Sequence, residues 1–156
     1  MKYVVTGGAG FIGSNLVDEL IRLKHKVVVL DNLSTGQISN LRQSIKKIKF
    51  IKIDLHKDKN KIYKIINKYK VNNIFHMAGL ADIVPSIVSP ETYFNSNVVG
   101  TFNILEAAKK FKVKKFIYAA SASCYGIPDK YPTNEKSKIK TEYPYALTKY
   151  IGEKLV

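Results

Sequence analysis

The chain alternates between short apolar runs and longer segments in which apolar residues recur every three or four positions. Runs rich in β-branched and aromatic residues predict strands at residues 2–6, 26–31, 48–54, 72–79 and 114–122. Helical spacing predicts helices at residues 11–24, 57–70 and 89–111. Pro144 begins a last predicted helix, because a proline in the first turn loses no intrahelical hydrogen bond.

Strands separated by helices predict an α/β fold with a doubly wound parallel sheet. Right-handed crossovers would place helices on both of its faces. The segment from Tyr125 to Tyr143 is punctuated by prolines and is expected to be a loop. No linker, repeat or low-complexity segment interrupts the pattern, so residues 1–156 are expected to form one domain.

Composition is that of a globular protein, with 46% hydrophobic and 24% charged residues. The segment MKYVVTGGAG turns to glycine where a signal peptide would remain apolar. Cys124 is the lone cysteine, which suits a reducing compartment. We therefore expect a cytoplasmic protein that does not span a membrane.

The formal net charge of +14 raises the possibility of a nucleic-acid or membrane partner. Only Arg22 and Arg42 are arginines, however, and the remaining 24 of the 26 basic residues are lysines. Arginine is the residue that reads bases and phosphates with a planar fork. Because the lysines are spread along the chain, we interpret them as a solvated surface and expect neither partner.

A glycine turn joins the first predicted strand to the first predicted helix. TGGAGFIGS can be read as Gly8-x-Gly10-x-x-Gly13 or as Gly7-x-x-Gly10-x-x-Gly13. Either spacing lets the backbone approach a pyrophosphate at the start of a helix, where N–H groups favour negative charge. Tight turns need glycine as well, so the pattern alone is a weak signal.

Asp31 supports the interpretation of the glycine turn as part of a dinucleotide site. It ends the second predicted strand, 18 residues beyond Gly13, where a carboxylate can accept hydrogen bonds from the adenosine ribose. Asn32 and Leu33 follow instead of an arginine, so a 2′-phosphate would meet negative charge. These residues predict a Rossmann fold that binds NAD in preference to NADP.

Two Tyr-x-x-x-Lys pairs lie in the last predicted helix: Tyr145 with Lys149, and Tyr150 with Lys154. So many tyrosines and lysines make such pairs common by chance. Tyrosine with its ordinary pKa near 10 is a poor base, but an ammonium group one helical turn away lowers such a pKa. Tyr145 lies in the opening turn and can reach the carboxyl edge of the sheet, whereas Tyr150 is expected to pack deeper in the helix.

Ser121 lies at the end of the fifth predicted strand, where its hydroxyl could bind the same substrate hydroxyl as the tyrosine. A small residue in a crowded turn is an equally good interpretation of this serine taken alone.

Seven motifs occur in family order along the chain: TGGAGFIGS, LDNLSTG, IDL, HMAGLADIVPS, NVVGT, SASCYG and PYALTK. Together they resemble the NAD-dependent epimerase/dehydratase family of extended short-chain dehydrogenases/reductases, above all its UDP-glucose and UDP-N-acetylglucosamine 4-epimerases. The resemblance implies a catalytic triplet of Ser121, Tyr145 and Lys149. It also implies an NAD site, without a metal, made of Gly7, Gly10, Phe11, Ile12, Gly13, Asp31, Asn32, Asp54, Leu55, Met77, Ala78, Gly79, Asn97, Tyr145 and Lys149.

In the mechanism that the resemblance implies, Tyr145 takes the proton of a sugar 4-hydroxyl while a hydride passes to NAD. The 4-keto sugar turns over, and the hydride returns to its opposite face. Related 4,6-dehydratases carry two acidic residues directly after the serine, where this chain has Ala122 and Ser123, so dehydration is not expected. Ala81 replaces a lysine that some epimerases place near the nicotinamide.

Members of this family are about twice as long and build the substrate pocket from a second half. We therefore expect residues 1–156 to be the NAD-binding domain of a UDP-hexose 4-epimerase, incomplete within the catalytic helix, without the carboxy-terminal substrate domain, and a homodimer at full length. Two alternatives remain open at this point. The chain could be a non-catalytic NAD-binding module, or part of a nucleotide-sugar reductase or dehydrogenase.

Overall fold

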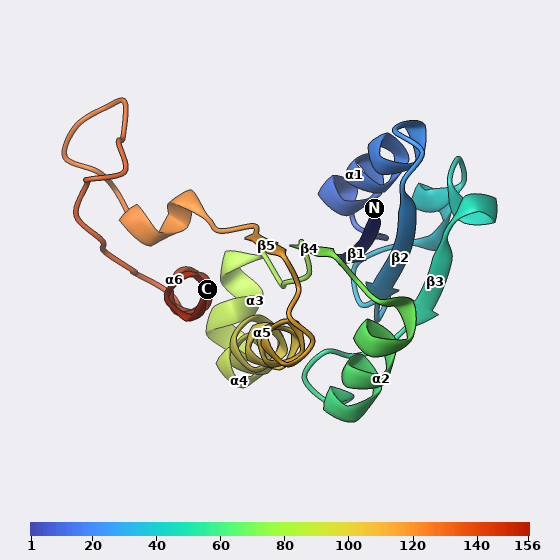
Figure 1. Ribbon diagram of the computed structural model, residues 1–156. Helices are drawn as coiled ribbons and strands as arrows, with labels where there is room; N and C mark the ends of the chain where they lie inside the picture. Colours follow the sequence, from blue (N-terminus) through green and yellow to red (C-terminus); the bar gives the residue numbers. More distant parts are fainter.

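A five-stranded parallel sheet forms the centre of the protein in a computed structural model that describes residues 1–156 (Figure 1). The strand order is β3-β2-β1-β4-β5. The strands are β1 (Lys2–Thr6), β2 (Lys26–Asp31), β3 (Lys49–Lys52), β4 (Asn73–His76) and β5 (Lys115–Tyr118). The chain moves outward from β1 to β3 and then reverses to β4, and such a reversal is where doubly wound sheets bind ligands.

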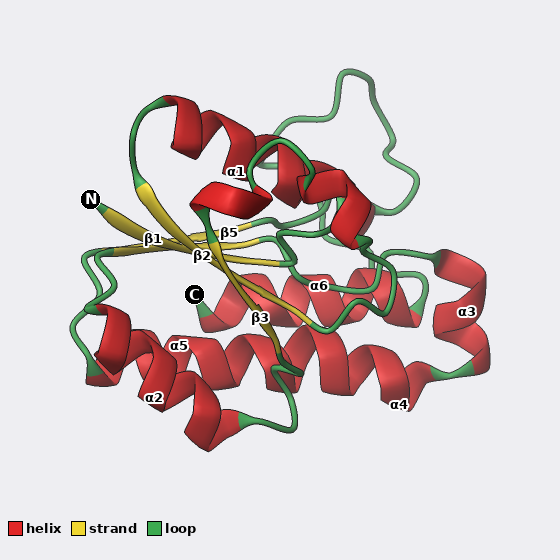
Figure 2. Cartoon of the chain, turned by 90° about the vertical axis from the view of Figure 1, so that its right-hand side faces the viewer, coloured by secondary structure: helices red, strands yellow, loops and turns green.

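Two hydrophobic cores, one on each face of the sheet, form where the strands pack against the helices. Alternate residues of a strand point to opposite faces, so Val4 packs on one face and Val5 on the other. The larger core has 13 buried residues and contains the buried faces of α2 (Lys59–Tyr69) and α5 (Gly100–Lys110). The smaller core has seven and contains α1 (Phe11–Arg22), on the opposite side of the sheet in Figure 2. The expected doubly wound Rossmann fold is confirmed.

The two faces are covered unequally. On the face of α2 and α5, Phe116 of β5 packs against the larger core. Its neighbour Ile117 points the other way and is 42% exposed, because α1 lies over the β1 and β2 half of the sheet. Helices therefore cover both faces of the sheet in its middle, as expected, but they cover only one face at its β5 edge.

The predicted helix at residues 89–111 is three consecutive helical pieces. They are α4 (Pro90–Tyr93), the π-helix η3 (Phe94–Val99) and α5. Phe94 and Gly100, at the junctions, keep right-handed helical backbone angles, so the chain continues without a break. The wide turn buries Asn97 against α6 (Pro144–Leu155), which packs beside η3. Single π-turns of this kind are frequent at functional sites.

One helix is absent from the sequence prediction. The short α3 (Ile83–Val88) has only six residues and carries Pro85 in its first turn, so the segment has no readable helical period. Short 3₁₀ turns complete the structure: η1 (Ile38–Leu41), η2 (Ile45–Lys47) and η4 (Ala122–Tyr125). None of the helices is both long enough and apolar enough to cross a membrane.

Candidate functional site: a dinucleotide cleft and a Ser-Tyr-Lys cluster

The glycine turn between β1 and α1 has no room for side chains. Gly7 adopts a positive φ of 66°, and a Cβ there would lie 2.6 Å from the backbone of Ala78. A Cβ on Gly13 would lie 2.1 Å from the carbonyl oxygen of Gly7. The turn therefore needs glycine at both positions, and it brings the backbone to the surface of the cleft at the start of α1.

Asp31, the last residue of β2, holds the glycine turn against the loop that follows β2. One carboxylate oxygen accepts from the backbone N–H of Ala9 over 2.9 Å, and the other accepts from that of Leu33 over 2.8 Å. Each oxygen keeps a second lone pair, and the side chain lines the cleft. The carboxylate can thus accept from a ligand hydroxyl without giving up its internal contacts.

A cleft of about 290 Å³ opens at the carboxyl edge of β1, β2, β3 and β4. Twelve residues predicted from the sequence line it: Gly7, Gly10, Phe11, Ile12, Gly13, Asp31, Asn32, Asp54, Leu55, Met77, Ala78 and Gly79. Nine others were missed as site residues: Leu30, Ser34, Thr35, Gly36, Ile53, His56, Leu80, Ala81 and Ser96. A signal for Ser34, Thr35 and Gly36 was present, because they lie in the LDNLSTG motif.

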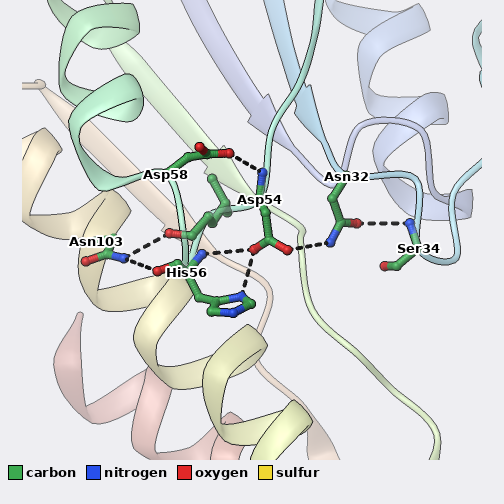
Figure 3. A network of polar contacts seen from close by, with 7 residues as sticks. Asn32, Ser34, Asp54, His56, Asp58 and Asn103 are labelled. Atoms are coloured by element: carbon green, nitrogen blue, oxygen red, sulfur yellow. Dashed lines mark hydrogen bonds and ion pairs between the residues drawn. The ribbon is translucent and has the colours of Figure 1, made fainter.

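Asp54 follows β3 and belongs to a polar network at the outer end of the cleft (Figure 3). Its Oδ1 atom accepts from the backbone N–H of His56 over 3.1 Å and lies 2.7 Å from the His56 imidazole Nδ1. The side chain of Asn103, on α5, donates to the backbone carbonyl groups of Leu55 and His56. This short segment is therefore fixed from two sides.

Ser121 and Tyr145 meet at the end of β5. The hydroxyl of Tyr145, in the first turn of α6, donates to Ser121 Oγ over 3.1 Å. The backbone N–H of Tyr145 donates to Ser86 Oγ of α3, which fixes the start of α6. Tyr150 takes no part, since its ring lies under the ammonium group of Lys154, 5.1 Å from the ring centroid. The structure thus brings Tyr145, and not Tyr150, to the serine.

Lys149 is buried beside the cleft. Its Nζ lies 4.3 Å from the centre of the Tyr118 ring, whose hydroxyl donates to the Lys149 backbone carbonyl. A Cβ added to Gly79, which lines the cleft, would lie 3.6 Å from Nζ. Burial lowers the pKa of Lys149 to about 8, because the apolar surroundings disfavour the charged form.

Asn97 forms hydrogen bonds to two parts of the site, and we call this arrangement the Asn97 brace. Its Oδ1 accepts from the backbone N–H of Leu80, while its Nδ2 donates to the Leu80 carbonyl and to Thr148 Oγ1. The side chain is 1% exposed, so its polar atoms are used inside the protein. This geometry favours an indirect role, in which Asn97 positions Leu80 and α6. Direct contact with a cofactor stays a prediction.

His76 is buried in the interior of the protein near Lys149. Its two ring nitrogens pair with the hydroxyl groups of Thr6 and Thr101, at 2.6 and 2.8 Å. Burial, together with the charge of Lys149, lowers the pKa of His76 to about 3, so the imidazole is neutral. It ties β4 to β1 and to α5.

The family model described as GDP-mannose 4,6 dehydratase matches residues 4–156. The chain belongs to this family. The expected membership of the epimerase/dehydratase family is thereby confirmed.

Relatives of the chain include several proteins named as 4-epimerases. UDP-glucose 4-epimerase of Mycolicibacterium smegmatis is 39% identical over 156 residues, which cover 98% of this chain and 49% of that protein. The crystal structure of UDP-glucose 4-epimerase from Thermotoga maritima with UDP-glucose matches with a TM-score of 0.93 and 34% identity. That of the Thermus thermophilus enzyme with NAD matches with a TM-score of 0.91 and 33% identity.

The two structural matches cover 99% of this chain and 49% of each crystallised chain. The chain thus spans about half the length of the curated relatives it matches.

Proposed function

We propose that residues 1–156 are the NAD-binding domain of a nucleotide-sugar 4-epimerase, which interconverts UDP-hexoses through a 4-keto intermediate. The observation that carries the proposal is the hydrogen bond of Tyr145 to Ser121, with the buried ammonium group of Lys149 one helical turn farther along α6 and beside Gly79 of the cleft. Similarity to 4-epimerases across the whole chain supports it.

The cleft fits a dinucleotide along the carboxyl edge of four strands. At β1, Gly7, Gly10, Phe11, Ile12 and Gly13 would hold the pyrophosphate, because the glycines leave backbone N–H groups free of side-chain cover. Negative charge is favoured there by the start of α1.

The remaining cofactor contacts follow from strand order. Asp31 and Asn32, after β2, would hold the adenosine ribose, and Asp54 and Leu55, after β3, would flank the adenine. On the other side of β1, the segment after β4 would approach the nicotinamide with Met77, Ala78 and Gly79. Asn97, Tyr145 and Lys149 complete the proposed set.

Tyr145 would remove the proton of the sugar 4-hydroxyl and return it after the sugar has turned over. Ser121 would bind the same hydroxyl, and the ammonium of Lys149 would stabilise the negative charge that forms on the tyrosine oxygen. Bound NAD would supply reversible hydride acceptance. No net oxidation results, so NAD is expected to stay bound during turnover.

Dehydration fits the site less well, although the family model carries a dehydratase description. Loss of water needs an acid and a base beside the reacting carbon. The positions after Ser121 are Ala122 and Ser123, and neither is acidic. Epimerisation needs only the Tyr-Ser pair and a hydride carrier.

We further propose that the natural protein adds a substrate domain to residues 1–156 and works as a homodimer in the cytoplasm. Phe94 and Leu147 support the dimer, since they line one apolar groove between η3 and α6 and are 47% and 46% exposed. Apolar side chains gathered in this way suit a contact between protein surfaces.

The test is to incubate the natural protein with UDP-glucose and follow UDP-galactose by NMR. Conversion without net NADH supports the proposal, and its loss in Tyr145→Phe assigns the proton transfer. Net production or consumption of NADH would instead indicate a reductase or dehydrogenase. NAD binding without turnover of any nucleotide sugar would indicate a binding module.

A further inference from the structure

The two carboxylate oxygens of Asp54, which lines the cleft, have different partners within the protein. Oδ1 accepts a hydrogen bond from the backbone N–H of His56 and lies 2.7 Å from the His56 Nδ1 atom. Oδ2 has only a long contact of 3.5 Å with Asn32 Nδ2. Oδ2 is therefore the acceptor that remains for a ligand (Figure 3).

The position of Asp54 suits the base of a dinucleotide. With the pyrophosphate at β1 and the ribose at β2, the base lies farther along the same edge, beside β3. Adenine carries an amino group at position 6, which donates to a carboxylate oxygen. A base with a carbonyl oxygen at that position would place acceptor against acceptor.

We propose that His56 is a positioning residue that fixes the Asp54 carboxylate so that Oδ2 reads the amino group of the base. This inference rests on the proposed NAD site and adds a determinant of base specificity to it. A carboxylate turns easily about its last torsion. The close contact with Nδ1, at 2.7 Å, holds Oδ1 in place and so sets the direction of Oδ2.

His56 can act in this way because its own backbone is fixed. Asn103 Nδ2 donates to the carbonyl oxygen of Leu55 over 2.9 Å and to that of His56 over 3.3 Å. Asn103 is buried on α5, and α5 packs in the larger core. The imidazole thus projects from a segment anchored to a core helix.

The test compares the binding of NAD and of nicotinamide hypoxanthine dinucleotide, which replaces the amino group by a carbonyl, by titration calorimetry. The protein is expected to prefer NAD by about tenfold, the effect of one mispaired acceptor in a partly exposed site. His56→Leu should reduce the preference to less than about threefold. In His56→Asn, a side-chain amide can donate in place of Nδ1, so the preference should remain.

His25→Leu is the matched control, because this histidine stacks on Tyr3 at the opposite end of β2. Both ligands are titrated into the same preparation, so a partly unfolded fraction cancels in the ratio of affinities. Equal weakening of both ligands by His56→Leu, with the preference kept, would overturn the inference. Equal binding of both by the unchanged protein would overturn it too, while leaving the proposed NAD site intact. Failure to bind either ligand would reject the NAD site itself.

Discussion

The hydroxyl of Tyr145 donates to Ser121 Oγ over 3.1 Å, joining the first turn of α6 to the end of β5. These residues are separated by a long loop in the sequence, and the parallel sheet brings them together at its carboxyl edge. Lys149, one helical turn beyond Tyr145, lies buried on the Tyr118 ring. Each member of the cluster is thus held by contacts of its own.

Replacing Tyr145 by phenylalanine removes the hydroxyl and keeps the ring. We expect the kcat for UDP-hexose epimerisation by the natural protein to fall by about 10²–10⁴-fold, the usual contribution of a general base. NAD affinity should change little. Tyr150→Phe is the matched control on the same helix. If both variants lose activity equally, Tyr145 has no special role.

Lys149→Met tests the cost of burying an ammonium group. The pKa of Lys149 is about 8 in the folded protein and near its usual value in the unfolded chain. Below pH 8 the Lys149 side chain is charged in both the folded and the unfolded state, so the full free-energy cost of burying the charge is present. As the pH rises above 8, Lys149 loses its proton first in the folded state, and the penalty falls until the pH exceeds the usual pKa of a lysine.

At pH 7 the free energy of unfolding should therefore be larger for the variant than for the natural sequence, by up to about 3 kcal/mol. At about pH 9.5 this difference should be smaller. Urea unfolding of both proteins at the two pH values measures this difference. Titration of the other lysines and tyrosines cancels in the comparison. A gain that does not depend on pH would show that burial does not shift this pKa.

Asn32→Arg tests the expected preference for NAD over NADP. The buried Asp31 carboxylate lies beside the expected 2′-position, and it would repel a phosphate there. We expect the natural sequence to prefer NAD by at least about tenfold. An arginine at position 32 should narrow that preference by pairing with the 2′-phosphate. Calorimetric titration of both dinucleotides provides the measurement, and an unchanged ratio would place the 2′-position elsewhere.

Gly13→Ala tests the close packing of the glycine turn. The added Cβ would meet the carbonyl oxygen of Gly7 at 2.1 Å, so the backbone must move. We expect a loss of about 3 kcal/mol in the free energy of unfolding, together with weaker NAD binding. Gly10→Ala is the matched variant, because its Cβ would lie 3.3 Å from the same oxygen. Urea unfolding should show a clearly smaller loss for Gly10→Ala.

Local patterns in the sequence predict the order of the strands and of every long helix, the glycine turn and the position of Asp31, but not the short helix α3. These features depend on residues close together along the chain. A strand alternates every two residues and a helix repeats every 3.6, so both can be read locally. The pairing of Tyr145 with Lys149 is of the same kind, since four residues span about one helical turn.

Contacts between side chains of distant segments could not be predicted from the sequence and were revealed by the fold. The contact of Tyr145 with Ser121 depends on how α6 returns to the sheet, and that of Asn103 with the turn after β3 on how α5 packs beside it. The brace formed by Asn97 requires the π-helical turn in η3, for which the sequence has no local signal. Contacts of this kind arise when strand order and helix packing are fixed together, because no local pattern records the distance between segments.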